Sequence, residues 1–316
     1  MAKTDKSHGD IKFYQQKVIR PEIDLRCPSC STALNELKVK YESSEINCPN
    51  CDYKIIFDGQ AWDARLQRDY PTDFSRQWDL WEKGKLGETH LMYGQTLKER
   101  FRSLLELLGL SENELNKMKI LEIGFGDGRL LQEIQKHSAM AYGIDLVKPL
   151  KSSCLRPGSV ICGDLFNIPF MPKQFDIVIC KGVIACTIDT RNAFYRISEQ
   201  VATNGMLYLN VYEKNCKKSL ILRKIFPGSW RYPESIRLII ANVIGVIRAT
   251  VKILSKRKSD FELFKIEWGN YKLSTYDVIS ARWTCIHTKE EIIGWFEEKG
   301  FKVRRIGMCN YVGIKR

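Results

Sequence analysis

Apolar and polar positions divide the chain into a polar start, a cysteine-containing segment and a long region of short apolar runs. Residues 1–20 are polar and charged throughout, so we expect a solvated tail without the apolar stretch of an export signal. Residues 21–60 hold two cysteine pairs around a strand-like alternation at Leu37, Val39 and Tyr41, which indicates a compact ribbon. Residues 61–117 are predicted as a helical linker, with helical spacing from Thr96 to Leu110 and a stop at Gly109.

From residue 118 onward, short apolar runs alternate with helical patterns. Five runs read KILEIG, AYGIDL, SVICGD, FDIVIC and GMLYLNVY, and the C-terminal FKVRRIG and NYVGIKR add two more. Such alternation is typical of a mostly parallel sheet with crossover helices on both faces. We therefore expect residues 118–316 to form one α/β domain with seven strands.

Positive charge is concentrated in one part of this domain. The formal net charge is +13, and twelve Lys or Arg stand against two acids between Lys214 and Asp260. Residues 214–275 exceed what a connection to the last strands requires, so we expect an inserted lid. Within it, residues 236–256 predict a basic amphipathic helix, with Arg237, Arg248 and Lys252 along one side and apolar residues along another.

Three roles are open for this insert. A lid helix would bury its apolar face on the domain, an interfacial helix would lie on a membrane surface, and the positive field would attract RNA. The ten uncharged residues 238–247 are too few for a bilayer, so no transmembrane segment is expected. Few aromatic residues in the insert could stack on bases, which weakens the RNA interpretation.

The first two cysteine pairs have the spacing of a metal site. Cys27 and Cys30 are separated by seventeen residues from Cys48 and Cys51, which suits a structural zinc ion with four thiolate ligands. A pair of redox motifs or plain thiols is the other interpretation. The chain has eleven cysteines, an odd number at scattered spacing, which favours a reducing, cytoplasmic compartment with a peripheral membrane location also open.

A glycine-rich turn follows the first apolar run. Gly124, Gly126 and Gly128 would let the backbone approach a ligand, with Glu122 immediately upstream. Asp145 ends the second run, where a carboxylate can hold ribose hydroxyls. Asp164 ends the third run, where its carboxylate could accept a hydrogen bond from an exocyclic amine. The spacing is G-x-G-x-G, whereas dinucleotide sites have G-x-G-x-x-G, and Glu122 suits a cationic sulfonium better than a pyrophosphate.

At this point the sequence resembles class I S-adenosylmethionine-dependent methyltransferases. LEIGFGDGRLLQEI, YGIDL, GDLFNIPF, QFDIVICKGVIACTIDTRNAF and NGMLYLNVY look like their successive motifs, over roughly residues 118–212. The resemblance implies a Rossmann-like seven-stranded sheet and a set of cofactor-binding residues: Glu122, Gly124, Phe125, Gly126, Gly128, Asp145, Leu146, Asp164, Leu165 and Lys181. Lys181 and Gly182 would lie beside the transferable methyl group.

Other segments resemble one subgroup of these enzymes, often preceded by a zinc ribbon and linked to small molecules or surface sugars. They are DFSRQWDLW, LMYGQT and YDVISARWTCIHTKEEIIGWFEEKGF. The chain departs from the subgroup at residues 184–187, Ile-Ala-Cys-Thr, where a His pair is common. His287 is the first candidate for a general base and His90 the second, and Trp78 and Arg282 are candidates to line the acceptor pocket. Thr288 and Glu291 also read as a capping box, which would place His287 merely at a helix entrance.

The expected activity is methyl transfer to an oxygen or nitrogen of a small-molecule, glycan or lipid-linked acceptor. An RNA methyltransferase that grips its substrate with ribbon and insert is the second hypothesis. A non-catalytic partner subunit with the same fold is the third.

Overall fold

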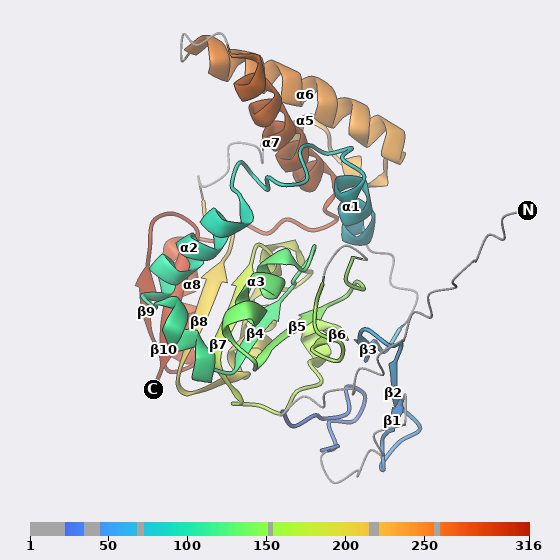
Figure 1. Ribbon diagram of the computed structural model, residues 1–316, viewed down its shortest axis with the longest axis vertical. Helices are drawn as coiled ribbons and strands as arrows, with labels where there is room; N and C mark the ends of the chain where they lie inside the picture. Colours follow the sequence, from blue (N-terminus) through green and yellow to red (C-terminus); the bar gives the residue numbers. More distant parts are fainter. Residues whose placement is uncertain (1–22, 35–44, 68–72, 151–153, 215–220, 256–259) are drawn as a thin grey trace, which may run out of the picture.

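The computed structural model describes residues 23–34, 45–67, 73–150, 154–214, 221–255 and 260–316. The predicted polar tail and the alternating residues Leu37, Val39 and Tyr41 lie outside these ranges. One ten-stranded sheet runs through the molecule in the order β1-β2-β3-β6-β5-β4-β7-β8-β10-β9 (Figure 1). Its strands are β1 Glu45–Asn47, β2 Lys54–Phe57, β3 Trp62–Asp63, β4 Ile120–Ile123, β5 Ala141–Asp145, β6 Val160–Cys162, β7 Phe175–Lys181, β8 Val201–Asn210, β9 Phe301–Arg305 and β10 Asn310–Lys315.

The seven strands expected from the apolar runs are β4 to β10, and the predicted α/β sheet is confirmed. Strands β6, β5, β4, β7 and β8 are parallel, and β10 pairs antiparallel with both β8 and β9. The ribbon adds three strands at the β6 edge, because β3 pairs parallel with β6 through Trp62 opposite Ile161. The cysteine-containing ribbon is thus joined to the main sheet by backbone hydrogen bonds.

Helices cover both faces of this sheet. The structure contains α1 Asp73–Glu82, α2 Leu97–Leu108, α3 Arg129–His137, α4 Thr190–Ser198, α5 Leu222–Ile225, α6 Glu234–Ser255, α7 Phe261–Ser280 and α8 Lys289–Glu298, with 3₁₀ turns η1 Glu112–Lys117, η2 Leu165–Asn167, η3 Ile184–Cys186 and η5 Ser229–Arg231. Alternate strand residues point to opposite faces. Ile120 and Ile177 therefore share a core with α2 and α3, whereas Leu121 and Val178 share one with α4 and α8.

Two predicted helix boundaries are confirmed by their caps. The Thr96 side chain accepts a hydrogen bond from the Glu99 amide, and the Glu99 side chain accepts one from the Thr96 amide. Gly109 ends α2 in the left-handed conformation at φ 71°. Thr288 and Glu291 form the same capping box at the start of α8. His287 consequently lies just outside the first turn of α8.

Helices α6 and α7 form a hairpin that stands apart from the sheet at one end of the molecule (Figure 1). The two helices pack along each other, and Lys252 of α6 pairs with Glu267 of α7 at 2.7 Å between Nζ and Oε1. Arg237 and Arg248 also turn inward, over the rings of Tyr276 and Tyr271. The predicted basic helix is present, but its cations face α7.

The structure disagrees with one of the three interpretations of this helix, the lid that buries its apolar face on the domain. Seven large apolar residues of α6 are exposed, because the inner positions are taken by small residues and cations: Ile236, Ile239, Val243, Val246, Ile247, Val251 and Leu254. The sequence predicts no transmembrane segment, because residues 238–247 alone are too few. The helix has 22 residues and few charges, so α6 is long and apolar enough to cross a membrane by length and composition, and neither property decides whether it does.

Candidate functional site

A cavity of about 620 Å³ lies at the carboxyl ends of β4, β5, β7 and β8. Helix α1 contributes Phe74, Gln77 and Trp78 to its wall, and α7 contributes Ser274 and Asp277. The carboxyl edge of a parallel sheet is where open α/β folds bind ligands, and this volume is in the usual range of small-molecule sites.

The turn after β4 brings the backbone against the cavity. Gly124 and Gly126 adopt positive φ angles of 74° and 57°. A Cβ on Gly124 would lie 2.2 Å from a Val183 methyl, and one on Gly126 would lie 2.7 Å from the Trp78 ring. Both the backbone conformation and the space therefore require glycine.

Asp145 holds this turn in place from the end of β5. Its Oδ2 accepts a hydrogen bond of 2.8 Å from the Gly126 amide, and its Oδ1 accepts one of 3.1 Å from Val147. Each carboxylate oxygen keeps a second lone pair. Burial raises the pKa of Asp145, and the amide hydrogen bonds oppose that effect. The arrangement leaves an acceptor pair at the cavity wall beside the glycine turn.

Glu122 is a buried carboxyl with an unusual environment. Its side chain borders the cavity at 5% exposure, and its Oε2 accepts no hydrogen bond from any residue that the structure describes. Burial raises the pKa of Glu122 to about 8, although the positive charge of Arg100 opposes the shift. An orphaned carboxylate oxygen of this kind is suited to a cationic ligand group.

Two cations border the same part of the cavity. Arg100 of α2 lies 3.8 Å from the buried Asp127 carboxylate and is itself 10% exposed in its side chain. Lys181 ends β7, where burial and Arg100 lower its pKa. The pocket therefore offers positions for both the positive and the negative groups of an amino acid moiety.

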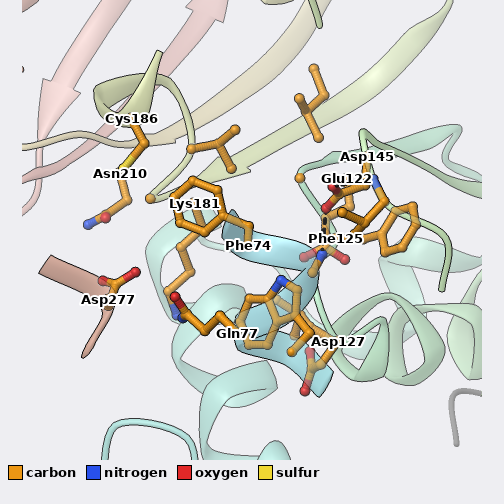
Figure 2. A pocket seen from close by; sticks show the side chains of 18 of the residues that line it. Phe74, Gln77, Glu122, Phe125, Asp127, Asp145, Lys181, Cys186, Asn210 and Asp277 are labelled. Atoms are coloured by element: carbon orange, nitrogen blue, oxygen red, sulfur yellow. Dashed lines mark hydrogen bonds between the residues drawn. The ribbon is translucent and has the colours of Figure 1, made fainter. Parts of the chain in front are cut away.

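The opposite part of the cavity holds a second group of polar residues. Tyr93 lies near Asp277, and Tyr212 lies near Cys186. Burial, and next the Asp277 carboxylate, raise the pKa of Tyr212. Partial removal from water, and next Asp277, raise the pKa of Tyr93, whose side chain lines the cavity at 47% exposure. Figure 2 shows Asn210 and Asp277 on one side of the cavity and Glu122 and Asp145 on the other.

Most of the predicted cofactor residues border this cavity: Glu122, Gly124, Phe125, Gly126, Asp145, Leu146, Leu165 and Lys181. Two do not line it. Gly128 caps α3 with φ 75°, and Asp164 caps η2 by accepting a hydrogen bond from the Phe166 amide. Trp78 borders the cavity as expected, and Arg282 stacks over the rings of Trp230 and Trp283 elsewhere.

The predicted bases lie away from the cavity. His287 borders a separate depression with Asp189 and Cys285 and packs edge-on against Trp295. Burial lowers its pKa. His90 is exposed, 4.0 Å from Glu88. Sequence reasoning missed Tyr93, Asp277 and Arg100, although Tyr93 and Asp277 stand in segments singled out for their resemblance.

The four cysteines of the ribbon come together as the spacing predicts. All four Sγ atoms lie within 4.8 Å of one another, with 3.7 Å between Cys27 and Cys51 and 3.5 Å between Cys30 and Cys48. Thiolates around a tetrahedral zinc ion are separated by about 3.8 Å, since each Zn–S bond is about 2.3 Å. The cluster could hold a metal ion.

Comparison with known proteins bears on the first part of the domain. Residues 121–209 match the family model described as a methyltransferase domain. No curated protein matches the chain. Three solved methyltransferase structures are similar. Magnesium protoporphyrin IX methyltransferase from Synechocystis is 14% identical with a TM-score of 0.43, over 79% of this chain and 98% of that one. An S-adenosylmethionine-dependent methyltransferase from Thermotoga maritima is 14% identical with a TM-score of 0.42, over 77% of this chain and 98% of that one, and an N-methyltransferase from Bradyrhizobium japonicum is 18% identical with a TM-score of 0.35, over 44% and 76%.

Proposed function

We propose that this chain is an S-adenosylmethionine-dependent methyltransferase that methylates an oxygen or nitrogen atom of a small-molecule, glycan or lipid-linked acceptor, a proposal that its match to a methyltransferase domain supports. The observation that carries this proposal is the division of one cavity into two parts. One part has the orphaned Glu122 and the glycine turn, and the other has Tyr93 near Asp277. Donor and acceptor could thus meet inside a single enclosed site.

The donor fits the residues around the glycine turn. Glu122 would pair with the methionine ammonium group, Arg100 with its carboxylate, and Asp145 with the ribose hydroxyls. The bound donor supplies a methyl group activated by the positive sulfur. Leu146 and Leu165 border the cavity beyond Asp145 and would contact the adenine ring.

Asp277 is the residue best placed to receive the acceptor's proton. The acceptor oxygen or nitrogen would attack the methyl carbon in line with the carbon–sulfur bond, which breaks as the new bond forms. The proton that the acceptor loses would pass to the Asp277 carboxylate, which the nearby Tyr93 hydroxyl would orient by donating a hydrogen bond. Tyr93 and Tyr212 are poor bases themselves, because their pKa values are raised.

Transfer of a radiolabelled methyl group to a cell extract tests this function. After fractionation into small molecules, lipids, glycans, protein and RNA, we expect label in the small-molecule, glycan or lipid fraction. Label in RNA alone would contradict the proposal and favour the RNA hypothesis. Absence of label in every fraction, with the donor bound, would favour a non-catalytic partner subunit.

We further propose that the cysteine cluster binds one structural Zn²⁺ ion in a reducing, cytoplasmic compartment. Four thiolates leave no open position for a substrate, so the metal would take no part in methyl transfer. The ribbon's own strands are short, and Cys27 is the fully buried member of the cluster. The ion would therefore stabilise the edge of the sheet where β3 meets β6.

Elemental analysis of two matched cysteine variants tests the zinc site. We expect Cys30→Ser to lose most of its zinc and to melt about 5 °C or more below the wild type, because a ligand is missing from a site that supports folding. Cys154→Ser, at an exposed cysteine outside the cluster, should keep about one zinc per chain. Full zinc content in Cys30→Ser would contradict a four-cysteine site.

A further inference from the structure

The outer face of α6 is the largest apolar surface of this hairpin. Its exposed side chains recur every three or four residues along the helix, from Ile236 and Ile239 through Val243 to Val251 and Leu254. Only 17% of the most apolar 18-residue window is buried. Soluble domains rarely leave a continuous apolar face of this length exposed, so a partner should cover it.

The charges of α6 leave this face uncharged. Lys252 is paired with Glu267, Arg248 lies 4.2 Å over the Tyr271 ring, and Arg237 faces Tyr276. All three cations therefore point toward α7. An apolar face without charge can enter the acyl boundary of a bilayer, whereas cations along it would oppose entry.

Positive residues lie before α6 in the structure and follow it in the sequence. Lys224 and Arg231 are exposed before α6, and the sequence after it continues with Lys256, Arg257 and Lys258, outside the described residues. Lys265 of α7 lies over the ring of the exposed Phe261, but its charge is offset by an ion pair with Glu262 at 3.0 Å between Nζ and Oε1. Cations at the two ends of an apolar helix match an anionic lipid surface, at about 1 kcal/mol for each Lys or Arg near it.

A second copy of the chain fits this surface less well. Both ends of α6 are basic, so pairing two α6 faces, parallel or antiparallel, would bring like charges together. A membrane-spanning α6 is also disfavoured, because its inner face is tied to α7 by the Lys252–Glu267 ion pair. A bilayer covers the apolar face with its acyl chains and attracts the flanking cations with its anionic headgroups.

We propose that the α6–α7 hairpin docks on an anionic lipid bilayer, with the outer face of α6 lying flat in the interface. The same hairpin borders the cavity through Arg248, Ser274 and Asp277. If the proposed function holds, a membrane amphiphile would thus reach the acceptor side from the bilayer. Docking itself does not depend on the chemistry of the cavity.

Sedimentation with vesicles tests docking without any methyl donor, so its failure is separate from failure of methyl transfer. We expect the full chain to bind vesicles of phosphatidylcholine with phosphatidylglycerol, and to bind pure phosphatidylcholine more weakly. Ile239→Glu with Val243→Glu should reduce binding about tenfold or more, since both side chains enter the interface. Ile314→Glu, at an exposed apolar residue of β10, is the matched control and should bind as the wild type does.

Three results would overturn the proposal. The wild type could fail to sediment with either kind of vesicle. It could form dimers that Ile239→Glu with Val243→Glu dissolves, without any lipid binding, which would assign the face to a second copy. It could resist extraction by salt and alkaline carbonate, which would indicate a spanning helix. Lys224→Glu provides a second variant on the rim, and it should weaken binding to anionic vesicles while leaving binding to neutral ones unchanged.

Discussion

The Glu122→Gln variant should bind S-adenosylmethionine about 30-fold or more weakly than the wild type, while its unliganded form becomes more stable. Weaker binding follows because the carboxylate that faces the ligand's positive charge is gone, at a cost of about 2 kcal/mol or more. Greater stability follows because a buried carboxyl with few hydrogen bonds resists ionisation. Calorimetric titration and thermal unfolding measure the two effects.

The stability gain should depend on pH in a defined direction. Burial raises the pKa of Glu122 from 4.5 in an exposed chain to about 8 in the folded protein. The unfolded chain therefore loses this proton first, and the folded wild type loses relative stability as pH rises from about 4.5 to 8. Relative to wild type, Glu122→Gln should be nearly neutral at pH 4.5 and stabilising on the order of 4 to 5 kcal/mol at pH 8.5.

Glu106→Gln is the matched control for this prediction. Glu106 is exposed on α2, so the same substitution there should change neither donor binding nor the pH dependence of unfolding. Donor affinity in Glu122→Gln within threefold of the wild type would remove Glu122 from the binding site. A stability difference independent of pH would contradict the origin of the effect in a buried carboxyl.

The Asp277→Asn variant should lose about 10²- to 10⁴-fold in kcat, with donor affinity changed by less than about threefold. The amide has nearly the shape of the carboxylate but cannot accept the proton that the acceptor releases. Tyr93→Phe should lose about tenfold, because the hydroxyl only orients Asp277. Steady-state kinetics on the acceptor found in the labelled extract, together with titration of the donor, measure both quantities.

His287→Ala tests the competing assignment of the base. His287 lies outside the cavity, so we expect kcat within about threefold of the wild type. A variant His287→Ala as impaired as Asp277→Asn, with normal folding, would return His287 to the mechanism. Normal turnover in Asp277→Asn would exclude Asp277 as the base.

The donor side of the site could be predicted from sequence because it is built from local signals. A strand that ends in a glycine turn fixes where Gly124 and Gly126 lie, and a strand-end carboxylate places Asp145 beside them. The cysteine spacing is equally local, and the structure brings Cys27, Cys30, Cys48 and Cys51 together. The seven strands could be predicted for the same reason, because each strand is an apolar run whose alternating or continuous pattern lies within a few residues.

The acceptor side and the membrane face depend on contacts between distant segments. Tyr93 and Asp277 are far apart in sequence, and only the packing of α7 against α1 brings the two residues to the same cavity. His287 looked favourable because of its neighbours in sequence, but α8 places it beside Trp295. Helical spacing showed that α6 has an apolar side, yet spacing alone does not tell which side faces α7.

A crystal structure with S-adenosylhomocysteine bound would test the central claim most directly. We expect its ammonium group at Glu122, its ribose at Asp145 and its sulfur facing the side of the cavity that holds Asp277. A ligand bound at any other place, or one whose sulfur points away from Asp277, would contradict the division of this cavity into donor and acceptor sides.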